Sequence, residues 1–232
     1  MPPIEAARPP ALRAQDVRGV VFDLDGTLVD SYRPIAASLN HARATSGLAP
    51  LPVDTVRHQV GRGLETLIRD MVGPDRVDRG VALFRERYSE IFLDQTTLLP
   101  RVNETLEALH RAGLPLSVAS NKPARFGERI LDHLGVGAFF RTVQGPDRAG
   151  TTKPEPTMIR TCVREMGLEL PAAVYVGDMP LDVESAARAG LPVILVTTGS
   201  AGAECLAATG ELVLSRLDEL LPALHIHRSS NS

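Results

Sequence analysis

"VVFDLDGTLVD" (residues 20–30) joins an apolar, β-branched run to two carboxylates that stand two residues apart. Its first three residues are typical of a buried parallel strand, because such strands are apolar on both faces. Asp23 and Asp25 follow at the carboxyl end of that strand, where burying a charge is costly unless a cation or hydrogen bonds compensate for it. A capping role and an Asp-Gly turn account for Asp25 but leave Asp23 unexplained. The stretch therefore indicates a site with chemistry.

Length and composition limit what the chain is built for. A chain of 232 residues suits one domain with a large insertion, or a core with a smaller second domain. The net charge of −3 argues against a nucleic-acid or membrane surface. No apolar run reaches the length of a membrane span, and residues 1–16 lack the apolar centre of a signal peptide. The two cysteines show no motif spacing, so we expect a cytoplasmic protein.

The spacing of apolar residues divides the chain into a core and an insert. Residues 31–99 carry apolar side chains at helical spacing, broken by glycines and prolines, which predicts a small α-helical cap. Residues 17–30 and 100–224 alternate strand and helix patterns, which predicts an α/β, Rossmann-like parallel sheet with helices on both faces. Residues 1–16 and 225–232 are expected to be flexible ends.

Polar residues follow the predicted strands, in positions that should converge. They are Asp23 and Asp25, Ser120 and Asn121, Lys153, Asp178 and Asp182. The carboxyl ends of parallel strands share one edge of a sheet, which is where ligands bind in open α/β sheets. Several carboxylates in one pocket raise each other's pKa values unless a counter-charge is present. Carboxylate oxygens with open water positions suit Mg²⁺, so the set of residues describes a site for a metal-bound phosphate.

Four motifs resemble those of the haloacid dehalogenase superfamily. They are DLDGTLVDS (residues 23–31), VASNKP (residues 118–123), TKPEP (residues 152–156) and VGDMPLD (residues 176–182). The motifs stand in the order and spacing of that family, each beside the end of a predicted strand. Within the family, the SNKP stretch and the helical insert most resemble phosphoglycolate phosphatase-like members. Four motifs in this order match by chance far more rarely than a single motif does, so the resemblance is specific.

The resemblance implies roles for five residues. Asp23 would be the nucleophile that takes the phosphoryl group as an aspartyl-phosphate. Asp25 would be the general acid for the leaving oxygen and then the base for the hydrolytic water. Ser120 and the backbone amide of Asn121 would hold phosphoryl oxygens, while Lys153 would balance charge between the phosphate and the nucleophile.

The resemblance also implies a Mg²⁺ site. Asp23, the carbonyl oxygen of Asp25 and Asp178 are its expected ligands. Asp182 would bind through a water molecule or support the ligands from behind, although it would also fit a plain role at a helix N-terminus. Met179 stands where many relatives carry Thr or Ser, so we expect altered metal affinity without loss of the site.

The implied activity is Mg²⁺-dependent hydrolysis of a small phosphorylated metabolite such as phosphoglycolate. Dehalogenases lack the second aspartate, so Asp25 argues against them, and phosphonatases use an insert lysine that residues 31–99 lack. A β-phosphoglucomutase-like mutase, a pyrophosphatase and a catalytically silent binding protein with this fold remain alternatives. Arg62, between two glycines of the insert, is the candidate partner for a substrate carboxylate, and a surface arginine in a turn is the competing interpretation.

Overall fold

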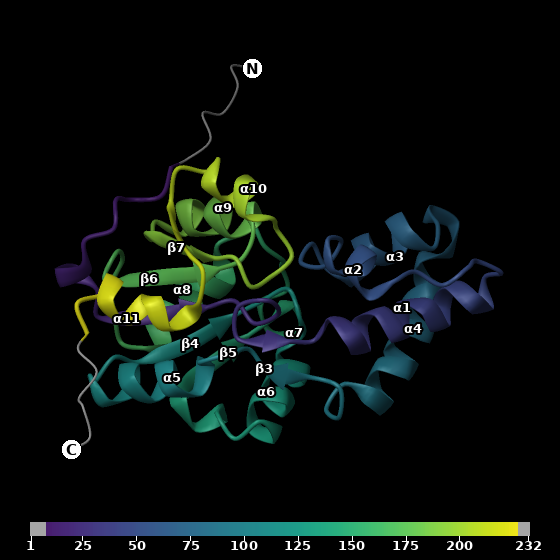
Figure 1. The fold of residues 1–232 in the computed structure, drawn as a ribbon, viewed down its shortest axis with the longest axis horizontal. Coiled ribbons are helices and arrows are strands. Elements are labelled where there is room, and N and C mark those ends of the chain that lie inside the picture. The colour runs from purple at the N-terminus through teal and green to yellow at the C-terminus, as the bar shows by residue number, and fades with distance from the viewer. Residues whose placement is uncertain (1–7, 227–232) are drawn as a thin grey trace.

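The computed structural model describes residues 8–226, and its core is a six-stranded sheet in the order β5-β4-β1-β6-β7-β8 (Figure 1). All neighbouring strands of this sheet run parallel. The strands are β1 (Gly19–Phe22), β4 (Leu116–Ala119), β5 (Phe140–Gln144), β6 (Ala173–Gly177), β7 (Val193–Val196) and β8 (Leu212–Leu214). The predicted α/β class with a parallel sheet is confirmed.

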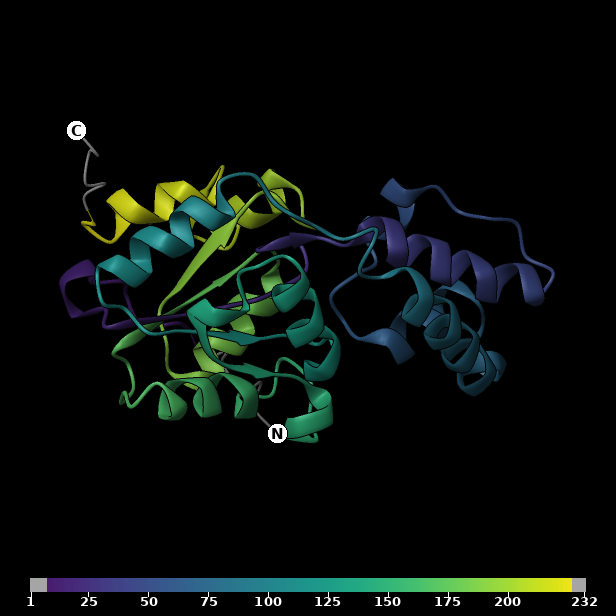
Figure 2. The ribbon, with the colours of Figure 1, turned by 90° about the horizontal axis from the view of Figure 1, so that it is seen from below.

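Helices cover both faces of the sheet. They are α5 (Val102–Arg111), α6 (Ala124–His133), α7 (Pro146–Ala149), α8 (Thr157–Glu165), α9 (Pro180–Ala189), α10 (Ala203–Ala207) and α11 (Leu220–Ala223), with short 3-10 helices η1 (Ala14–Asp16), η3 (Gly137–Phe139) and η4 (Leu217–Glu219). Successive strand residues point to opposite faces, so Val20 and Phe22 pack in one apolar cluster with α5 and α11, whereas Val21 packs in another with α8 and α9 (Figure 2). The middle strand β1 is therefore buried on both sides.

A helical insert interrupts the core directly after the first strand. It contains α1 (Tyr32–Thr45), α2 (Val53–Arg57), α3 (Leu64–Met71), the 3-10 helix η2 (Pro74–Arg76) and α4 (Val77–Ile91). Its two connections to the core pair as a short antiparallel ribbon of β2 (Val29–Asp30) and β3 (Thr97–Leu98). Figures 1 and 2 show the insert as a separate lobe beside the sheet. We call this lobe, residues 31–99, the cap.

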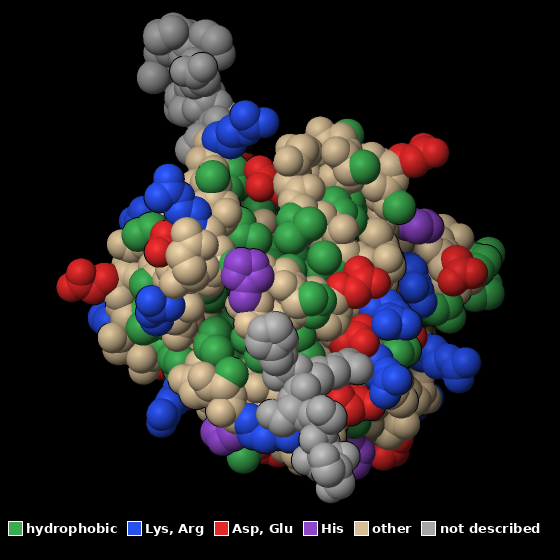
Figure 3. Space-filling model, turned by 60° about the vertical axis from the view of Figure 1, so that its left-hand side comes forward, with side chains coloured by type: hydrophobic (Ala, Val, Ile, Leu, Met, Phe, Trp, Pro, Cys, Tyr) green, Lys and Arg blue, Asp and Glu red, His purple; other side chains and the backbone are tan. Residues whose placement is uncertain are grey.

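The ends of the chain and the outer surface complete the description. Of the ends expected to be flexible, residues 1–7 and 227–232 lie outside the described residues, while Leu12 and Ile226 pack against the core. Figure 3 shows one face of the molecule, on which basic and acidic side chains are interspersed. Within residues 8–226, no helix combines the length and the apolar character that a membrane crossing requires.

Candidate active site

One pocket brings together five of the seven residues that were expected to converge, and Asp178 and Asp182 are absent from its wall. Its core wall contains Asp23, Asp25, Ser120, Asn121 and Lys153. Its cap wall is largely apolar, and contains Ile35, Val60, Leu64, Leu67 and Phe84. The pocket therefore has a charged floor at the carboxyl edge of the sheet and an apolar roof from the insert.

Asp23 lies at the end of β1, and its two carboxylate oxygens differ in their contacts. Its backbone amide donates to the Val176 carbonyl at 2.8 Å, which continues the pairing of β1 with β6. Its Oδ2 lies 3.0 Å from Nζ of Lys153. Its Oδ1 is buried and has no hydrogen-bond partner within residues 8–226. An unsatisfied buried oxygen is costly, and a cation or the phosphorus of a substrate would relieve that cost.

Lys153 is a buried cation held among acidic groups. Its Nζ lies 2.8 Å from Oδ1 of Asp182 and donates to the Tyr175 hydroxyl at 3.2 Å, besides its contact with Asp23. Burial alone would lower the pKa of Lys153, but the carboxylates of Asp182 and Asp23 outweigh it and hold the pKa well above its ordinary value. The side chain therefore stays an ammonium next to the predicted nucleophile.

Asp178, at the end of β6, is packed against backbone that only glycine allows. Its Oδ2 accepts from the amide of Ser200 at 2.7 Å and from the hydroxyl of that residue at 2.9 Å. A Cβ on Gly199 would lie 1.8 Å from this oxygen, and one on Gly26 would lie 2.8 Å away. Gly26 also has a φ of 85°, a left-handed conformation that favours glycine. The Asp25-Gly26 turn therefore leaves space for the carboxylate of Asp178.

Asp182 supports its neighbours with both of its oxygens. Its Oδ2 accepts from the backbone amides of Asp178 at 2.9 Å and Met179 at 3.0 Å, which caps the first turn of α9. Its Oδ1 accepts from Nζ of Lys153 at 2.8 Å. The alternative role at a helix N-terminus is thus present, and it is combined with an ion pair to the buried lysine.

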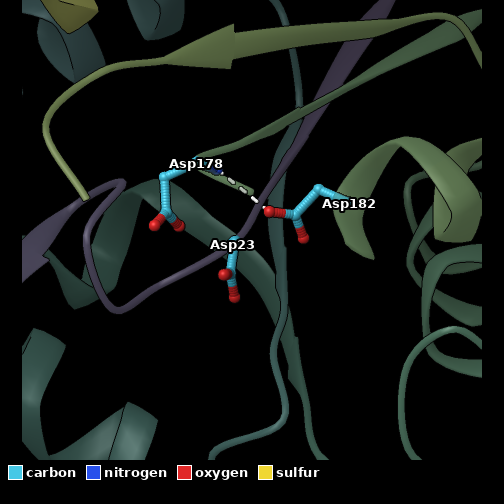
Figure 4. Close-up of side chains that lie close together, drawn as sticks. All are labelled: Asp23, Asp178 and Asp182. Carbon is cyan, nitrogen blue, oxygen red and sulfur yellow. Dashed lines mark hydrogen bonds between the residues drawn. The ribbon is translucent and has the colours of Figure 1, made fainter. Parts of the chain in front are cut away.

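Three of these carboxylates form a group that fits a metal ion. One oxygen from each of Asp23, Asp178 and Asp182 lies within 4.8 Å of the others, and all three residues are buried (Figure 4). Hard divalent cations prefer such oxygen ligands, and the unpartnered Oδ1 of Asp23 leaves a ligand position open. The group is consistent with metal binding.

Within residues 8–226, Asp25 is held by two donors, neither of which the sequence singled out. The hydroxyl of Ser31 donates to its Oδ1, and Nζ of Lys122 lies 3.2 Å from its Oδ2. The same Nζ donates to the hydroxyl of Tyr88, on α4 of the cap, at 2.7 Å. Burial would lower the pKa of Lys122, but Asp25 and Tyr88 raise it above its ordinary value, so the lysine is charged. Lys122 was visible only as part of the SNKP stretch, and Tyr88 only as part of a helical stripe.

Ser120 and Asn121 lie at the end of β4, and the side chain of Asn121 also forms a hydrogen bond with the cap. The side-chain carbonyl of Asn121 accepts from the backbone amide of Lys153 at 2.7 Å, and its amide donates to the Gly61 carbonyl of the cap at 2.9 Å. A second bond across the boundary joins Nδ1 of His58 to the Ser200 carbonyl at 2.9 Å. The cap is therefore closed over the pocket.

Arg62 and Met179 are not part of the pocket wall. The guanidinium of Arg62 pairs with Asp70 at 2.9 Å, is 56% exposed, and is absent from the pocket wall. Arg85, on α4, lines the pocket instead. The Met179 sulfur packs against Gly61 so closely that a Cβ there would lie 2.2 Å from it. Met179 therefore forms part of the contact between core and cap.

The pKa of Asp178 predicts how the free energy of unfolding depends on pH. Burial, with Asp182 and Asp23 nearby, raises the pKa of Asp178 from 3.8 to about 8. The folded protein therefore keeps a proton that the unfolded chain releases, so this stabilisation is complete below about pH 3.8 and is lost as pH rises towards 8. We expect the free energy of unfolding of the metal-free protein to fall by about 2 kcal/mol between roughly pH 5.5 and pH 7.5.

Thermal unfolding in chelator at these two pH values measures the loss, with Asp178→Asn as the non-titrating control. Added Mg²⁺ should raise the unfolding temperature more at the higher pH, where it competes with fewer protons. Equal pH slopes for the parent and Asp178→Asn would contradict the prediction.

Comparisons with known proteins place the chain among phosphate-handling hydrolases. A family model described as "Haloacid dehalogenase-like hydrolase" matches residues 20–196. The chain is similar to the phosphoglycolate phosphatase of Pseudomonas putida, with 34% identity over 215 residues, covering 88% of this chain and 79% of that protein. It is 31% identical over 242 residues to the phosphoglycolate phosphatase of Shigella boydii, covering 94% and 96%. A crystal structure described as a predicted phosphoglycolate phosphatase from Haemophilus somnus matches with a TM-score of 0.81 and 27% identity, covering 90% of this chain and 98% of that one.

Proposed function

The chain belongs to the haloacid dehalogenase-like hydrolase family, and from this premise we propose that it is a Mg²⁺-dependent phosphatase that hydrolyses a small phosphate monoester, phosphoglycolate or a close analogue, through an aspartyl-phosphate. The observation that carries the proposal is the arrangement at Asp23. Its unpartnered, buried Oδ1 lies in a pocket with Asp25, and its Oδ2 is paired with Lys153. A nucleophile and an acid–base group thus share one charged floor.

A metal ion would be held by the acidic group to which Asp23 belongs. Asp23, the backbone carbonyl of Asp25 and Asp178 are the proposed ligands of Mg²⁺. Asp182 keeps its neighbours in place, because both of its oxygens accept bonds from protein donors. Bound Mg²⁺ would neutralise charge on the phosphoryl oxygens and so let a carboxylate approach them.

The reaction has two displacement steps at phosphorus. In the first, a carboxylate oxygen of Asp23 forms a bond to phosphorus, the bond from phosphorus to the ester oxygen breaks, and Asp25 gives that oxygen a proton. In the second, water attacks the phosphorus of the aspartyl-phosphate, Asp25 takes a proton from the water, and the bond to Asp23 breaks to release phosphate. Ser120, the amide of Asn121 and Lys153 hold the phosphoryl oxygens through both steps.

A panel of phosphate monoesters with Mg²⁺ tests the proposal. We expect phosphate release from phosphoglycolate at a higher kcat/KM than from glucose 1-phosphate or pyrophosphate, and loss of all activity in chelator. The same panel, analysed for isomerised sugar phosphate, detects a mutase. Full turnover in chelator would show that the reaction does not need Mg²⁺. If no phosphate ester were hydrolysed, the alternative of a catalytically silent binding protein would be favoured.

The pocket contains a cation suited to a substrate carboxylate. Arg85 lines the pocket and has Glu65 as an exposed partner at 3.4 Å, whereas Arg62 points to Asp70. We therefore expect Arg85→Gln to raise KM for phosphoglycolate about tenfold with little change in kcat, the scale of one partly screened charged hydrogen bond. KM for p-nitrophenyl phosphate, which has no carboxylate, should change by less than about twofold. Arg62→Gln in the same assay decides between the two arginines. A rise in KM confined to Arg62→Gln would return the assignment to Arg62.

A further inference from the structure

Each of the two lysines of this chain pairs with one aspartate of the DLDG stretch. The chain has 25 basic residues of the Lys and Arg types, of which only Lys122 and Lys153 are lysines. Both line the pocket, and their side chains are 8% and 1% exposed. Lys153 pairs with Asp23 and Lys122 pairs with Asp25. An ammonium is a compact charge, unlike the planar guanidinium that this chain uses at every other basic position, so each aspartate of the DLDG stretch has its own compact cation.

Lys122 fixes the orientation of the Asp25 carboxylate. The hydroxyl of Ser31 donates to Oδ1 and the ammonium of Lys122 lies 3.2 Å from Oδ2, so the plane of the carboxylate is defined from both sides. The side chain of Asp25 is only 12% exposed, so water replaces neither donor easily. A carboxylate held by a donor on each oxygen keeps a fixed direction towards a water molecule in the pocket.

Tyr88 makes the position of Lys122 depend on the cap. Its hydroxyl accepts from Lys122 at 2.7 Å, and its ring packs edge-on against Phe126 of the core at 5.4 Å. On the cap side the ring stacks with Phe84 at 5.5 Å and Phe92 at 5.3 Å. Tyr88 therefore spans the boundary, and movement of α4 away from the core would withdraw an acceptor from Lys122.

We propose that Lys122 is a positioning residue that holds Asp25 as the base for hydrolysis of the aspartyl-phosphate, and that Tyr88 keeps Lys122 in place when the cap is closed. The inference rests on the proposed function, since it assigns the residue to the second of its two steps. Loss of Lys122 leaves Asp25 with one of its two donors. The step that needs Asp25 as a base then slows, whereas attack by Asp23 on a substrate with a good leaving group proceeds.

Rapid-quench kinetics with ³²P-labelled p-nitrophenyl phosphate and Mg²⁺ separates the two steps. For Lys122→Met we expect kcat to fall about 10–100-fold, part of the 10²–10⁴-fold that an acid–base group contributes. Phosphoenzyme formation should change by less than about threefold, so labelled enzyme accumulates. Added to Asp25→Asn, Lys122→Met should slow hydrolysis no further, because both changes act on one group. Arg125→Met, an exposed neighbour outside the pocket, is the control and should keep the parent's rates.

The outcomes separate the inference from the proposed function. Equal slowing of both steps, no accumulation of labelled enzyme, or an additional loss in the double variant would overturn the role of Lys122. A parent enzyme that turns over neither aryl nor alkyl phosphates would instead overturn the proposed function. If Lys122→Met does not fold, Tyr88→Phe decides, because it keeps the ring contacts and removes only the hydroxyl. It should accumulate labelled enzyme with a loss of about 2–10-fold in kcat, and unchanged kinetics would count against the inference.

Discussion

Asp23→Asn is expected to lower turnover of phosphoglycolate by about 10⁵-fold or more, the scale on which enzymes lose rate with their nucleophile. The amide has nearly the volume of the carboxylate and can still accept from Lys153, so the pocket should keep its shape. An amide oxygen, however, does not form an acyl-phosphate that water then hydrolyses back to the starting side chain. Phosphate release over hours at high enzyme concentration measures the residual rate.

Two controls separate loss of the nucleophile from loss of the fold or of the metal. Thermal unfolding with and without Mg²⁺ shows whether Asp23→Asn folds and how much metal affinity it loses. Asp30→Asn makes the same chemical change in the same motif, at a residue that lies outside the pocket wall and pairs with Arg57 at 3.9 Å. Asp30 is half-buried and its Oδ1 accepts from the backbone amide of Tyr32 at 3.2 Å, a bond that an amide oxygen can still accept, so we expect Asp30→Asn to keep activity within about threefold. Near-normal turnover by Asp23→Asn would show that another group attacks phosphorus.

Asp25→Asn should slow both chemical steps, each by about 10²–10⁴-fold, while sparing substrate binding. An alkyl leaving oxygen such as that of glycolate needs a proton, whereas an aryl oxide leaves readily without one. Formation of the phosphoenzyme should therefore suffer less from p-nitrophenyl phosphate than from phosphoglycolate. Hydrolysis of the phosphoenzyme is common to both substrates, so it should slow equally for each.

Single-turnover kinetics with the two substrates supplies an internal control for Asp25→Asn. General damage to the pocket slows aryl and alkyl phosphates alike, so the ratio of their phosphoenzyme formation rates reports on proton transfer alone. An unchanged ratio in Asp25→Asn would take the acid role away from this residue. Unchanged hydrolysis of the phosphoenzyme would take away its role as the base.

The core of this site was predictable because strand ends obey a topological rule. Asp23, Ser120 and Asp178 follow apolar strand patterns, and parallel strands bring their carboxyl ends to one edge however far apart they are in sequence. The structure places the first two in one pocket with Lys153, and Asp178 beside Asp23 in the acidic group. Local pattern and sheet topology together were sufficient for this part.

Contacts between core and cap were not predictable in the same way. Helical periodicity places Tyr88 on the apolar face of α4, but it does not tell which core group that face meets. The hydrogen bond from Lys122 to Tyr88 joins residues 34 positions apart, and it depends on how the β2–β3 connection orients the cap relative to the core. For the same reason the sequence offered Arg62, in a glycine-flanked turn, only as a candidate beside the interpretation of a surface arginine, and it gave no sign that the packing of α4 brings Arg85 to the pocket wall.

The double role of Asp182 was only half visible in the sequence. A carboxylate in the first turn of a helix is a familiar pattern, and Asp182 does accept from the amide of Met179. Its ion pair with Lys153 at 2.8 Å joins the first turn of α9 to a loop 29 residues earlier in the chain, and no local pattern indicates it. Asp182 is therefore a buried residue that both caps α9 and pairs with Lys153, and not an exposed cap.

The most direct test of the account is to locate the phosphate on the enzyme. Asp25→Asn, mixed with ³²P-labelled p-nitrophenyl phosphate and Mg²⁺, should accumulate an acid-stable, hydroxylamine-labile phosphoenzyme because its hydrolysis is slow. Proteolysis and mass mapping of the quenched protein should then find the phosphoryl group on Asp23. Label on any other residue, or turnover of this variant without labelled protein, would contradict the assignment of Asp23 as the nucleophile.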